Sequence, residues 1–380
     1  MVILKRRTKG FFSGTKSEEI LEGRAWESES GKVHRLMPDL DEDRDRCPDV
    51  DKRVFSMVEP ELLEDQYKPV GFELRVGQTI AVSDTFFPEV NEFDWARLDK
   101  LKIEEGREFV LEPDENGRKV YYIPTYERFS LMGNYDMLID SRSTTGRVGC
   151  MSHHVGETID GEKIVAVQLF AFPIIIRPGE TRLFQAFLRY KGSDFLGNGE
   201  LKESWKVKLV ENERDVFDER LSEHGLEMTF STDFAYKARK CDEPIDMDMR
   251  GLVDPGKYFE RIEPGNESIV EPNVFYLFGT REEIILGDIC GRLSRAHHKS
   301  GTGLWTDFAG FFQPGFRGEI TLECYSNVRR KIRTGDSAGI VVFDDVKKGD
   351  IEHFEPTFKI YSGDYQGQKA PKLPKMFKEW

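Results

Sequence analysis

Two stretches far apart in the chain carry the residue types that chemistry on a nucleoside triphosphate requires. Residues 140–149, Asp-Ser-Arg-Ser-Thr-Thr-Gly-Arg-Val-Gly, contain two arginines with three hydroxyls between them. Guanidinium groups and hydroxyls are donors that match phosphate oxygens. Residues 309–323, Ala-Gly-Phe-Phe-Gln-Pro-Gly-Phe-Arg-Gly-Glu-Ile-Thr-Leu-Glu, predict a glycine-turned hairpin that ends on a carboxylate. Together the two stretches predict the halves of one nucleotide site.

The chain also contains an internal repeat, which shows how these stretches are related. Short patterns recur at an interval that drifts only from 154 to 156 residues. The matched segments are 71–74 with 225–228, 125–131 with 280–286, 176–180 with 332–336, and Phe187 with Phe343. Each match is weak by itself, but a common register is hard to obtain by chance. We therefore infer that one β domain has been duplicated.

Composition and pattern predict a mainly β protein with few helices. The 380 residues include 34 Gly, 28 Phe and 12 Tyr, and short apolar runs lie between turn residues. Residues 165–176 predict two short strands broken at Pro173, and residues 338–344 predict one buried strand. The expected architecture is two packed antiparallel sheets in each copy.

The repeat divides the chain into four parts. Residues 1–61 are highly charged and contain a short helix signal at residues 17–23. Residues 62–195 form the first copy, and residues 196–221 form a charged connector with some helix or an edge strand. Residues 222–380 form the second copy and its C-terminal tail. The arginine-rich loop therefore falls in the first copy and the acidic hairpin in the second.

The repeat register indicates that the two copies have diverged in complementary ways. A shift of 156 residues relates Glu323 to Val167, so the first copy has an aliphatic residue where the second has the acid. A shift of 154 or 155 residues relates Arg147 to Gly301 or Thr302, so the second copy lacks the arginine. If both sets serve one reaction, the copies must meet across an interface, within one molecule or between two.

Charge and cysteine content argue against several classes of protein. The formal net charge of −14 argues against binding along a nucleic-acid backbone, which needs clustered cations. No apolar run is long enough to cross a bilayer, and the start of the chain lacks the apolar region of a signal peptide. Five scattered cysteines without CxxC spacing fit a reducing compartment. We expect a soluble cytoplasmic protein without nucleic-acid or membrane partners.

Three motifs resemble those of the dCTP deaminase branch of the dUTPase-like superfamily. They are the hairpin at residues 310–323, the loop Arg142-Ser-Thr-Thr-Gly-Arg147-Val-Gly, and the tail Asp364-Tyr-Gln-Gly-Gln368-x-x-Pro371. The resemblance covers residues 65–380, and the tandem arrangement is similar to the double-length dCTP deaminases of some bacteria. It implies two tandem dUTPase-like domains of the antiparallel β-sandwich or β-clip barrel type. The implied activity is hydrolytic deamination of dCTP to dUTP and ammonia.

The resemblance implies a reaction that is metal-independent at the base, with Glu323 as the proton shuttle. Attack of water on C4 of cytosine needs a base, and protonation of N3 and of the leaving amine needs an acid. One buried glutamate can serve both in turn. Burial beside Phe311, Phe312 and Phe316 would raise the pKa of Glu323 toward neutrality. The alternative role for Glu323 is a structural carboxylate at a strand end.

Further residues are carried over from the family as substrate ligands. The triphosphate, with its Mg²⁺, is expected at Arg142, Ser143, Thr144 and Arg147; the base or sugar at Ala309 and Gly310; and a closing lid at Tyr365, Gln366 and Gln368. Small residues at positions 309 and 310 would leave room for the ligand. The less specific interpretations are a surface salt-bridge loop assisted by Asp140, an ordinary turn, and a flexible chain end.

A zinc-dependent deaminase is not predicted, because the H-x-E and P-C-x-x-C signature is missing. The adjacent His153 and His154 are expected on opposite faces of a strand, where both are poorly placed to bind one metal. The same argument applies to His297 and His298.

Two other functions stay open. A dUTP diphosphatase, or a bifunctional enzyme, is the nearer alternative, although Gln313 stands where related hairpins usually carry Asp. A nucleotide-binding sensor that kept the fold is the more distant one. Because relatives assemble as trimers with sites between subunits, we expect a homo-oligomer with sites between repeats.

Overall fold

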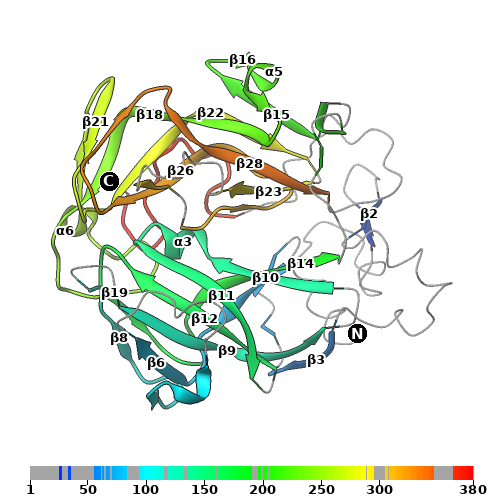
Figure 1. Ribbon diagram of the computed structural model, residues 1–380, viewed down its shortest axis with the longest axis vertical. Helices are drawn as coiled ribbons and strands as arrows, with labels where there is room; N and C mark the ends of the chain where they lie inside the picture. The colour runs from blue at the N-terminus through cyan, green and yellow to red at the C-terminus, as the bar shows by residue number, and fades with distance from the viewer. Residues whose placement is uncertain are drawn as a thin grey trace.

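The fold consists of two large curved antiparallel sheets, which lie one above the other in Figure 1. The computed structural model describes residues 25–27, 33–35, 55–60, 62–63, 66–68, 71–83, 94–114, 119–131, 135–159, 161–190, 196–197, 200–202, 206–287, 289–294, 304–306, 308–345 and 363–379. Helix in these ranges occurs in short pieces, namely η4 (Trp95–Arg97), α3 (Ser143–Gly146), α5 (Phe217–Arg220), α6 (Pro255–Tyr258) and residues 200–202. The prediction of a mainly β protein with few helices is confirmed. None of the described helices is long and apolar enough to span a membrane.

The lower sheet in Figure 1 has ten strands and comes from the first half of the chain. Its order is β4-β5-β14-β10-β11-β12-β9-β6-β7, and β3 pairs with β9. The strands are β3 (Phe55–Glu59), β4 (Tyr67–Lys68), β5 (Gly71–Arg75), β6 (Thr79–Ser83), β7 (Lys100–Lys102), β9 (Val120–Leu131), β10 (Tyr135–Ser141), β11 (Cys150–Ile159), β12 (Glu162–Leu169) and β14 (Arg182–Tyr190). Strand β12 ends at Leu169, and a separate strand, β13 (Ile174–Ile176), begins directly after Pro173, as predicted.

The upper sheet has eleven strands and comes from the second half. Its main order is β16-β15-β22-β18-β28-β23-β25, with β17 and β20 on β18, β26 on β22, and β24 on β26. The strands are β15 (Val207–Glu211), β16 (Arg214–Asp215), β17 (Leu221–Ser222), β18 (Gly225–Ala238), β20 (Phe259–Ile262), β22 (Tyr276–Leu286), β23 (Ile289–Ser294), β24 (Leu304–Trp305), β25 (Phe311–Phe312), β26 (Arg317–Ser326) and β28 (Ser337–Asp345). The predicted strand at residues 338–344 is therefore β28. The predicted connector contains β15, β16 and α5, and its strand β15 joins the second sheet.

Three smaller sheets complete the set of strands. They are β1 (Ala25–Glu27) with β2 (Val33–Arg35), β21 (Glu267–Val270) with β27 (Arg330–Arg333), and β8 (Phe109–Leu111) with β13 and β19 (Ile245–Asp246). The last of these crosses between the halves, because β8 and β13 belong to the first half and β19 to the second. The predicted helix at residues 17–23 lies outside the described residues.

Equivalent strands of the two large sheets pair at the register that the repeat predicts. Val167 of β12 pairs with Tyr121 of β9. Both partners recur 156 residues later, where Glu323 of β26 pairs with Leu277 of β22. The acid of the second copy and the aliphatic residue of the first therefore occupy the same place in their sheets.

Each copy also buries the glutamate of its Thr-x-Glu pattern in a polar cluster. Glu127 accepts hydrogen bonds from the backbone amide of Arg75 at 3.0 Å and from its guanidinium at 2.7 Å. Glu282 accepts them from the amide and hydroxyl of Thr229 at 2.9 and 2.6 Å and forms an ion pair with Arg220 at 3.1 Å. Burial raises the pKa of Glu282, and the bonds from Thr229 oppose that shift. This cluster is a shared element of the scaffold.

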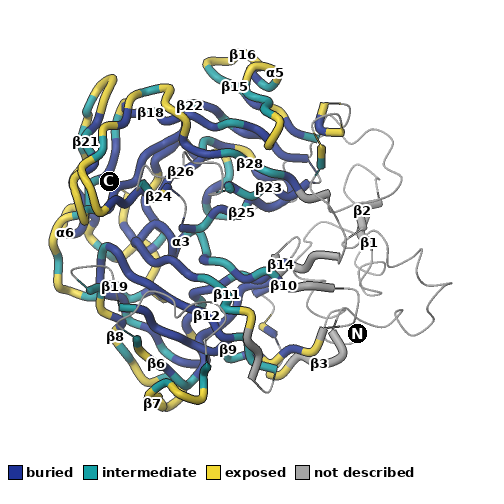
Figure 2. The backbone as a smooth tube through the Cα atoms, in the orientation of Figure 1, coloured by how far each residue is buried: buried dark blue, intermediate teal, exposed yellow. Residues whose placement is uncertain are grey.

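One hydrophobic cluster spans the two halves, a second is formed by residues 196–365, and buried backbone continues from sheet to sheet in Figure 2. Phe172 of the first half meets Tyr258 and Phe259 of the second edge-to-face, with ring centroids 5.3 and 5.1 Å apart. Phe377, near the end of the chain, packs on both rings at 5.6 Å. Such aromatic contacts bury large apolar areas and hold the halves in a defined relation.

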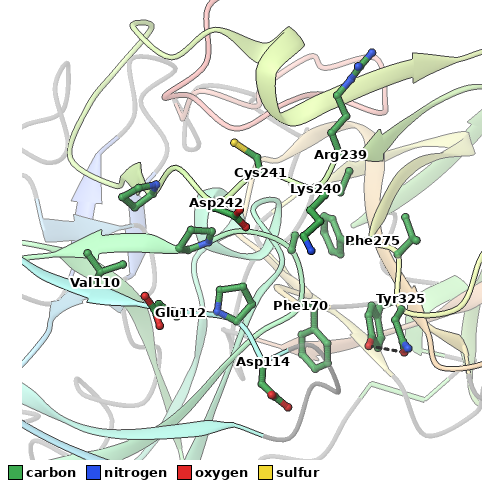
Figure 3. A pocket seen from close by; sticks show the side chains of 17 residues that line it. Val110, Glu112, Asp114, Phe170, Arg239, Lys240, Cys241, Asp242, Phe275 and Tyr325 are labelled. Carbon is green, nitrogen blue, oxygen red and sulfur yellow. Dashed lines mark hydrogen bonds between the residues drawn. The ribbon is translucent and has the colours of Figure 1, made fainter.

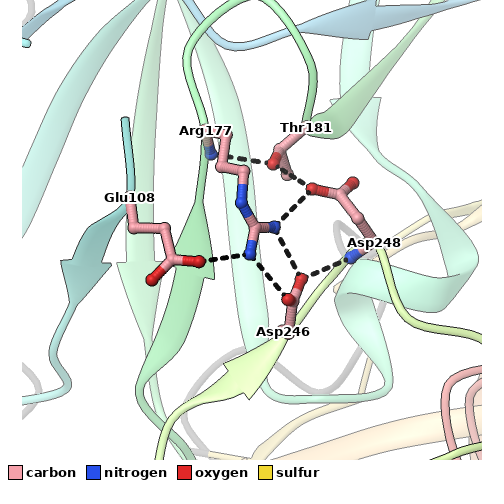
Figure 4. Close-up of polar contacts among 5 residues, drawn as sticks. All are labelled: Glu108, Arg177, Thr181, Asp246 and Asp248. Carbon is pink, nitrogen blue, oxygen red and sulfur yellow. Dashed lines mark hydrogen bonds and ion pairs between the residues drawn. The ribbon is translucent and has the colours of Figure 1, made fainter. Parts of the chain in front are cut away.

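A charged cluster reinforces this seam (Figure 4). Arg177, just after β13, binds Asp246 at 2.8 Å, Asp248 at 3.2 Å and Glu108 at 2.6 Å. The hydroxyl of Thr181 donates to Asp248 at 2.6 Å. The hydrogen bond from Arg177 lowers the pKa of Asp246. Because Asp246 and Asp248 belong to the second half, the cluster ties the halves together.

Candidate active site

The arginine-rich loop lies between the two sheets as the single turn α3 (Figure 1). It connects β10 to β11, and the hydroxyls of Ser141 and Ser152 bond at 2.7 Å to hold these strands together. The amide of Gly146 donates to the carbonyl of Arg142 at 2.8 Å and closes the turn. This geometry presents residues 143–147 toward the second half.

Glu323 lies within β26 and is only 3% exposed. Its Oε2 accepts a hydrogen bond from the amide of Phe308 at 3.4 Å. Its Oε1 lies 3.4 Å from the point where a Cβ on Gly146 would stand. The structure therefore brings the loop of the first half and the carboxylate of the second half together within one chain.

Arg147 is the buried cation of this region, and its side chain lies among residues of the C-terminal tail. One terminal nitrogen donates to the carbonyl of Lys372 and the other to Oε1 of Gln368, each at 3.0 Å. The guanidinium also stacks over the ring of Tyr365 at 3.7 Å. Among the described residues, Arg147 has no carboxylate partner, and its Nε has no hydrogen bond. A buried guanidinium with only neutral partners is suited to receive an anion.

Arg142 is held very differently. Its guanidinium pairs with Glu73 at 2.8 Å and donates to the carbonyl of Arg182 at 2.7 Å. Asp140 instead accepts a hydrogen bond from the amide of Ser141 at 2.8 Å. The charge of Arg142 is therefore compensated within the first half, by Glu73.

The tail forms a strap along β26. The hydroxyl of Tyr365 bonds to that of Thr144 at 2.9 Å, which links the tail to the arginine-rich loop. The side chain of Gln366 bonds at 3.0 Å to backbone atoms around the start of β26. Gln368 crosses β26 at Gly318, whose φ of +152° and lack of a side chain allow the approach, because a Cβ there would lie 3.1 Å from Gln368. The three predicted lid residues thus lie against the loop and the hairpin.

The remaining predicted ligands lie at the edge of the same region. Ala309 is half-buried and faces Gly146 across the seam. Gly310 is buried, and its carbonyl accepts a hydrogen bond from the amide of Leu293 at 2.8 Å. Ser143 is half-buried at the start of α3, and its carbonyl accepts from the amide of Arg147 at 3.2 Å.

The three rings expected around Glu323 have other partners. Phe311 stacks on Phe187 of the first half, with ring centroids 3.3 Å apart. Phe312 and Phe316 stack on each other at 5.7 Å. The aromatic residue that bonds to Glu323 is Phe308, three residues before β25 begins at Phe311. Sequence reasoning missed it because the contact is made by the backbone amide, which leaves no mark in side-chain types.

A second residue that sequence reasoning missed is Phe170, which supports Phe308 from the first half. Their ring centroids are 5.0 Å apart, and Phe170 also meets Tyr325 at 4.6 Å. At the 156-residue interval that relates Val167 to Glu323, Phe170 corresponds to Ser326, the residue after Tyr325, so the repeat alone did not point to this contact. Phe170 and Tyr325 join the two halves at the seam.

A cavity of about 770 Å³ opens on the other side of these rings (Figure 3). Phe170, Phe275 and Tyr325 form one wall, and Lys240 and Asp242 lie near its middle. None of the predicted substrate ligands lines this cavity. The contacts around Arg147 and Glu323 therefore define the candidate site, because they join the groups that the chemistry requires.

Within the described ranges, no group of three or more His, Cys, Asp or Glu side chains is arranged to hold a metal ion. His153 and His154 are successive residues of β11 and pair with Ala166 and Val165 of β12. His297 and His298 lie outside the described residues.

Comparison with known proteins supports the motif-based resemblance. A family model for dCTP deaminase-like proteins matches residues 48–189. A second family model matches residues 204–377 and describes the C-terminal domain of 2'-deoxycytidine 5'-triphosphate deaminase. The chain belongs to the dCTP deaminase family. Its two halves each match a model of that family, and the predicted resemblance is confirmed.

Individual members of the dCTP deaminase family give the degree of similarity. A dCTP deaminase of Aeropyrum pernix is 30% identical over 157 residues, which are 41% of this chain and 82% of the relative. A protein of Persephonella marina named "dCTP deaminase, dUMP-forming" is 34% identical over 140 residues, 35% of this chain and 74% of the relative. The crystal structure of 2'-deoxycytidine 5'-triphosphate deaminase from Agrobacterium tumefaciens aligns with a TM-score of 0.62 and 20% identity, over 76% of this chain and 92% of that one. This structural similarity supports the assignment of the fold.

Proposed function

We propose that this protein hydrolyses the amino group of dCTP, releasing dUTP and ammonia. The observation that carries the proposal is the approach of Gly146 to Glu323, which puts the arginine-rich loop beside a buried carboxylate. Arg147 follows Gly146 directly and supplies a buried positive charge. One chain thus combines an anion-binding group with a proton-transfer group, as a nucleotide deaminase needs.

The triphosphate, carried as its Mg²⁺ complex, would bind at Arg147 with help from Ser143 and Thr144. Phosphate oxygens would take over the donors that now bond to the neutral oxygens of Gln368 and Lys372, because charge-assisted hydrogen bonds are stronger. Arg142 would act as a positioning residue, since Glu73 already compensates its charge. Tyr365, Gln366 and Gln368 would close over the bound nucleotide, and Ala309 and Gly310 would border the base or sugar.

Glu323 would serve as base and then acid. Its carboxylate would take a proton from water as the oxygen attacks C4 of cytosine, and would pass that proton to N3. It would then take the proton of the new C4 hydroxyl and pass it to the exocyclic nitrogen, so that the C4–N bond breaks, ammonia leaves and the C4 carbonyl forms. Oε2 accepts the bond from Phe308, and Oε1 lies on the side of Gly146 in the loop. General acid–base catalysis of this kind contributes about 100- to 10,000-fold to rate.

A dUMP-forming enzyme is the second candidate. The names of the relatives from Persephonella marina and Salinispora arenicola, each "dCTP deaminase, dUMP-forming", support it. Against it stands Gln313, whose buried amide has no hydrogen-bond partner among the described residues. An amide cannot take a proton from water as a carboxylate can, so we favour release of dUTP.

The test is incubation of the purified protein with dCTP and Mg²⁺ while ammonia, pyrophosphate and nucleotide products are followed. Ammonia with dUTP supports the proposal. Ammonia with dUMP and pyrophosphate supports the second candidate. Binding of dCTP with neither product would indicate a nucleotide sensor and overturn both enzymatic proposals.

We also propose that the chain forms a homo-oligomer, as the resemblance implies. Light scattering coupled to size-exclusion chromatography measures the assembly directly. A strictly monomeric mass at working concentrations, together with full activity, would refute it.

A further inference from the structure

We infer that the contact between Gly146 and Ala309 sets the distance between the arginine-rich loop and the carboxylate of Glu323. Gly146 would then be a positioning residue for catalysis. The inference rests on the proposed deamination, and it adds a residue that acts through its small size.

The contact leaves no room for a side chain at position 146. A Cβ placed on Gly146 would lie 2.7 Å from the Cβ of Ala309, 3.3 Å from its amide nitrogen and 3.4 Å from Oε1 of Glu323. Real Cβ atoms essentially never come within 3.0 Å of another heavy atom, so one side of the seam would have to move. The backbone of Gly146 is outside the left-handed region, so alanine would fit its conformation. Space alone therefore requires glycine here.

A displacement at this contact would reach both charged groups of the site. Ala309 follows Phe308, whose amide donates to Glu323, and precedes Gly310, whose carbonyl is bonded to β23. On the other side, Gly146 precedes Arg147, whose guanidinium is held by three contacts with the tail. Movement of either backbone would change the separation between Arg147 and Glu323.

The surroundings prevent the strain from spreading harmlessly. Phe308 is fully buried against Phe170 at 5.0 Å and Phe275 at 5.4 Å. Close-packed interiors of this kind transmit displacement to their neighbours. We therefore expect a methyl group at position 146 to be felt at Glu323.

The test compares Gly146→Ala with the double variant Gly146→Ala/Ala309→Gly, which moves one methyl group from one side of the contact to the other. We expect Gly146→Ala to lower kcat for dCTP deamination by about 10- to 100-fold, because a misplacement near 1 Å can cost about that much. The KM for dCTP should change by less than about 3-fold, because the displacement affects the transition state more than substrate binding. The double variant should regain most of the lost kcat.

Gly256→Ala serves as the matched control. Gly256 also has an ordinary backbone conformation, but its added Cβ would only meet Asp254 at 3.5 Å. Its kcat should equal that of the wild type. Thermal unfolding of all variants separates positioning from loss of fold.

Wild-type kcat in Gly146→Ala would overturn the inference. So would a folded double variant that stays as slow as Gly146→Ala, because the methyl group would then act by another route. If Gly146→Ala does not fold, the double variant is compared with wild type: a kcat near wild type supports the inference, and a folded double variant about 10-fold slower or more overturns it. A wild-type protein that releases no ammonia would instead refute the proposed function, which is a different result.

Discussion

The two copies of the repeat differ most where they face each other. Val167 and Glu323 occupy equivalent places in their respective sheets. Val167 is part of the apolar core, whereas Glu323 faces the arginine-rich loop. The clusters around Glu127 and Glu282, by contrast, appear in both copies. The buried glutamate cluster is therefore present in both halves, whereas the candidate site is divided between them.

The same contrast holds at the seam. Arg177 binds two aspartates of the second half, whereas Arg333, its counterpart 156 residues later, is 62% exposed and lies 3.9 Å from Glu267. Only one of two equivalent arginines therefore joins the halves. Positions that are equivalent in the repeat register have different contacts here because each meets a different neighbour.

The largest effect is expected from removing the acid that only the second copy carries. Glu323→Gln should lower kcat for dCTP deamination by about 100- to 10,000-fold, because the amide cannot transfer protons. The dissociation constant for dCTP, measured by calorimetry, should stay within about a few-fold of the wild-type value, because the proton transfers stabilise the transition state and not the bound substrate. Glu227→Gln in β18 is the control, and near-wild-type turnover in Glu323→Gln would remove this residue from the mechanism.

The shared clusters allow a test of how equivalent the scaffolds are. Glu127→Ala should lower the free energy of unfolding by about 3–5 kcal/mol, because it leaves the guanidinium of Arg75 buried without its partner. Glu282→Ala should cost less, since Arg220 is more exposed and burial already disfavours the charged form of Glu282. Urea denaturation measures both values. Equal losses in the two variants would contradict the difference we assign to burial.

The two arginines of the loop should separate binding from stability. Arg147→Met should weaken dCTP binding by about 10- to 100-fold, as expected from losing a charged hydrogen-bond donor. Arg142→Met should act mainly on the melting temperature, because Glu73 would lose its nearest cation. Calorimetry and thermal unfolding of both variants check this. The assignment fails if Arg142→Met weakens dCTP binding as much as Arg147→Met does.

The smallest effect is expected from lowering the pH, which protonates Asp246 in the charged cluster around Arg177. The folded pKa of Asp246 lies below its unfolded value, so the cluster stabilises the fold above about pH 4, the ordinary pKa of aspartate. That contribution is lost as the pH falls through the lowered pKa. The melting temperature of Arg177→Met should therefore fall less steeply than that of wild type below pH 4. Parallel curves would show that Arg177 is not the cause.

Local and periodic features could be predicted from the sequence. The repeat interval, the break at Pro173 and the strand at residues 338–344 agree with the structure because each depends on nearby residues or on a common register. The partners of individual side chains could not be predicted. Arg142 pairs with Glu73 instead of Asp140, and Phe311 stacks on Phe187.

The sequence by itself determined the chemical groups available to this protein: a loop with two arginines, a strand with one acid, and a repeat that assigns them to different halves. Only the tertiary structure decided that these groups meet within one chain, and that Arg147, unlike Arg142, has no carboxylate partner among the described residues. The physical reason is that both outcomes depend on packing across the seam. Phe172 with Phe259 and Gly146 with Ala309 join residues far apart along the chain, so no local pattern records their distance.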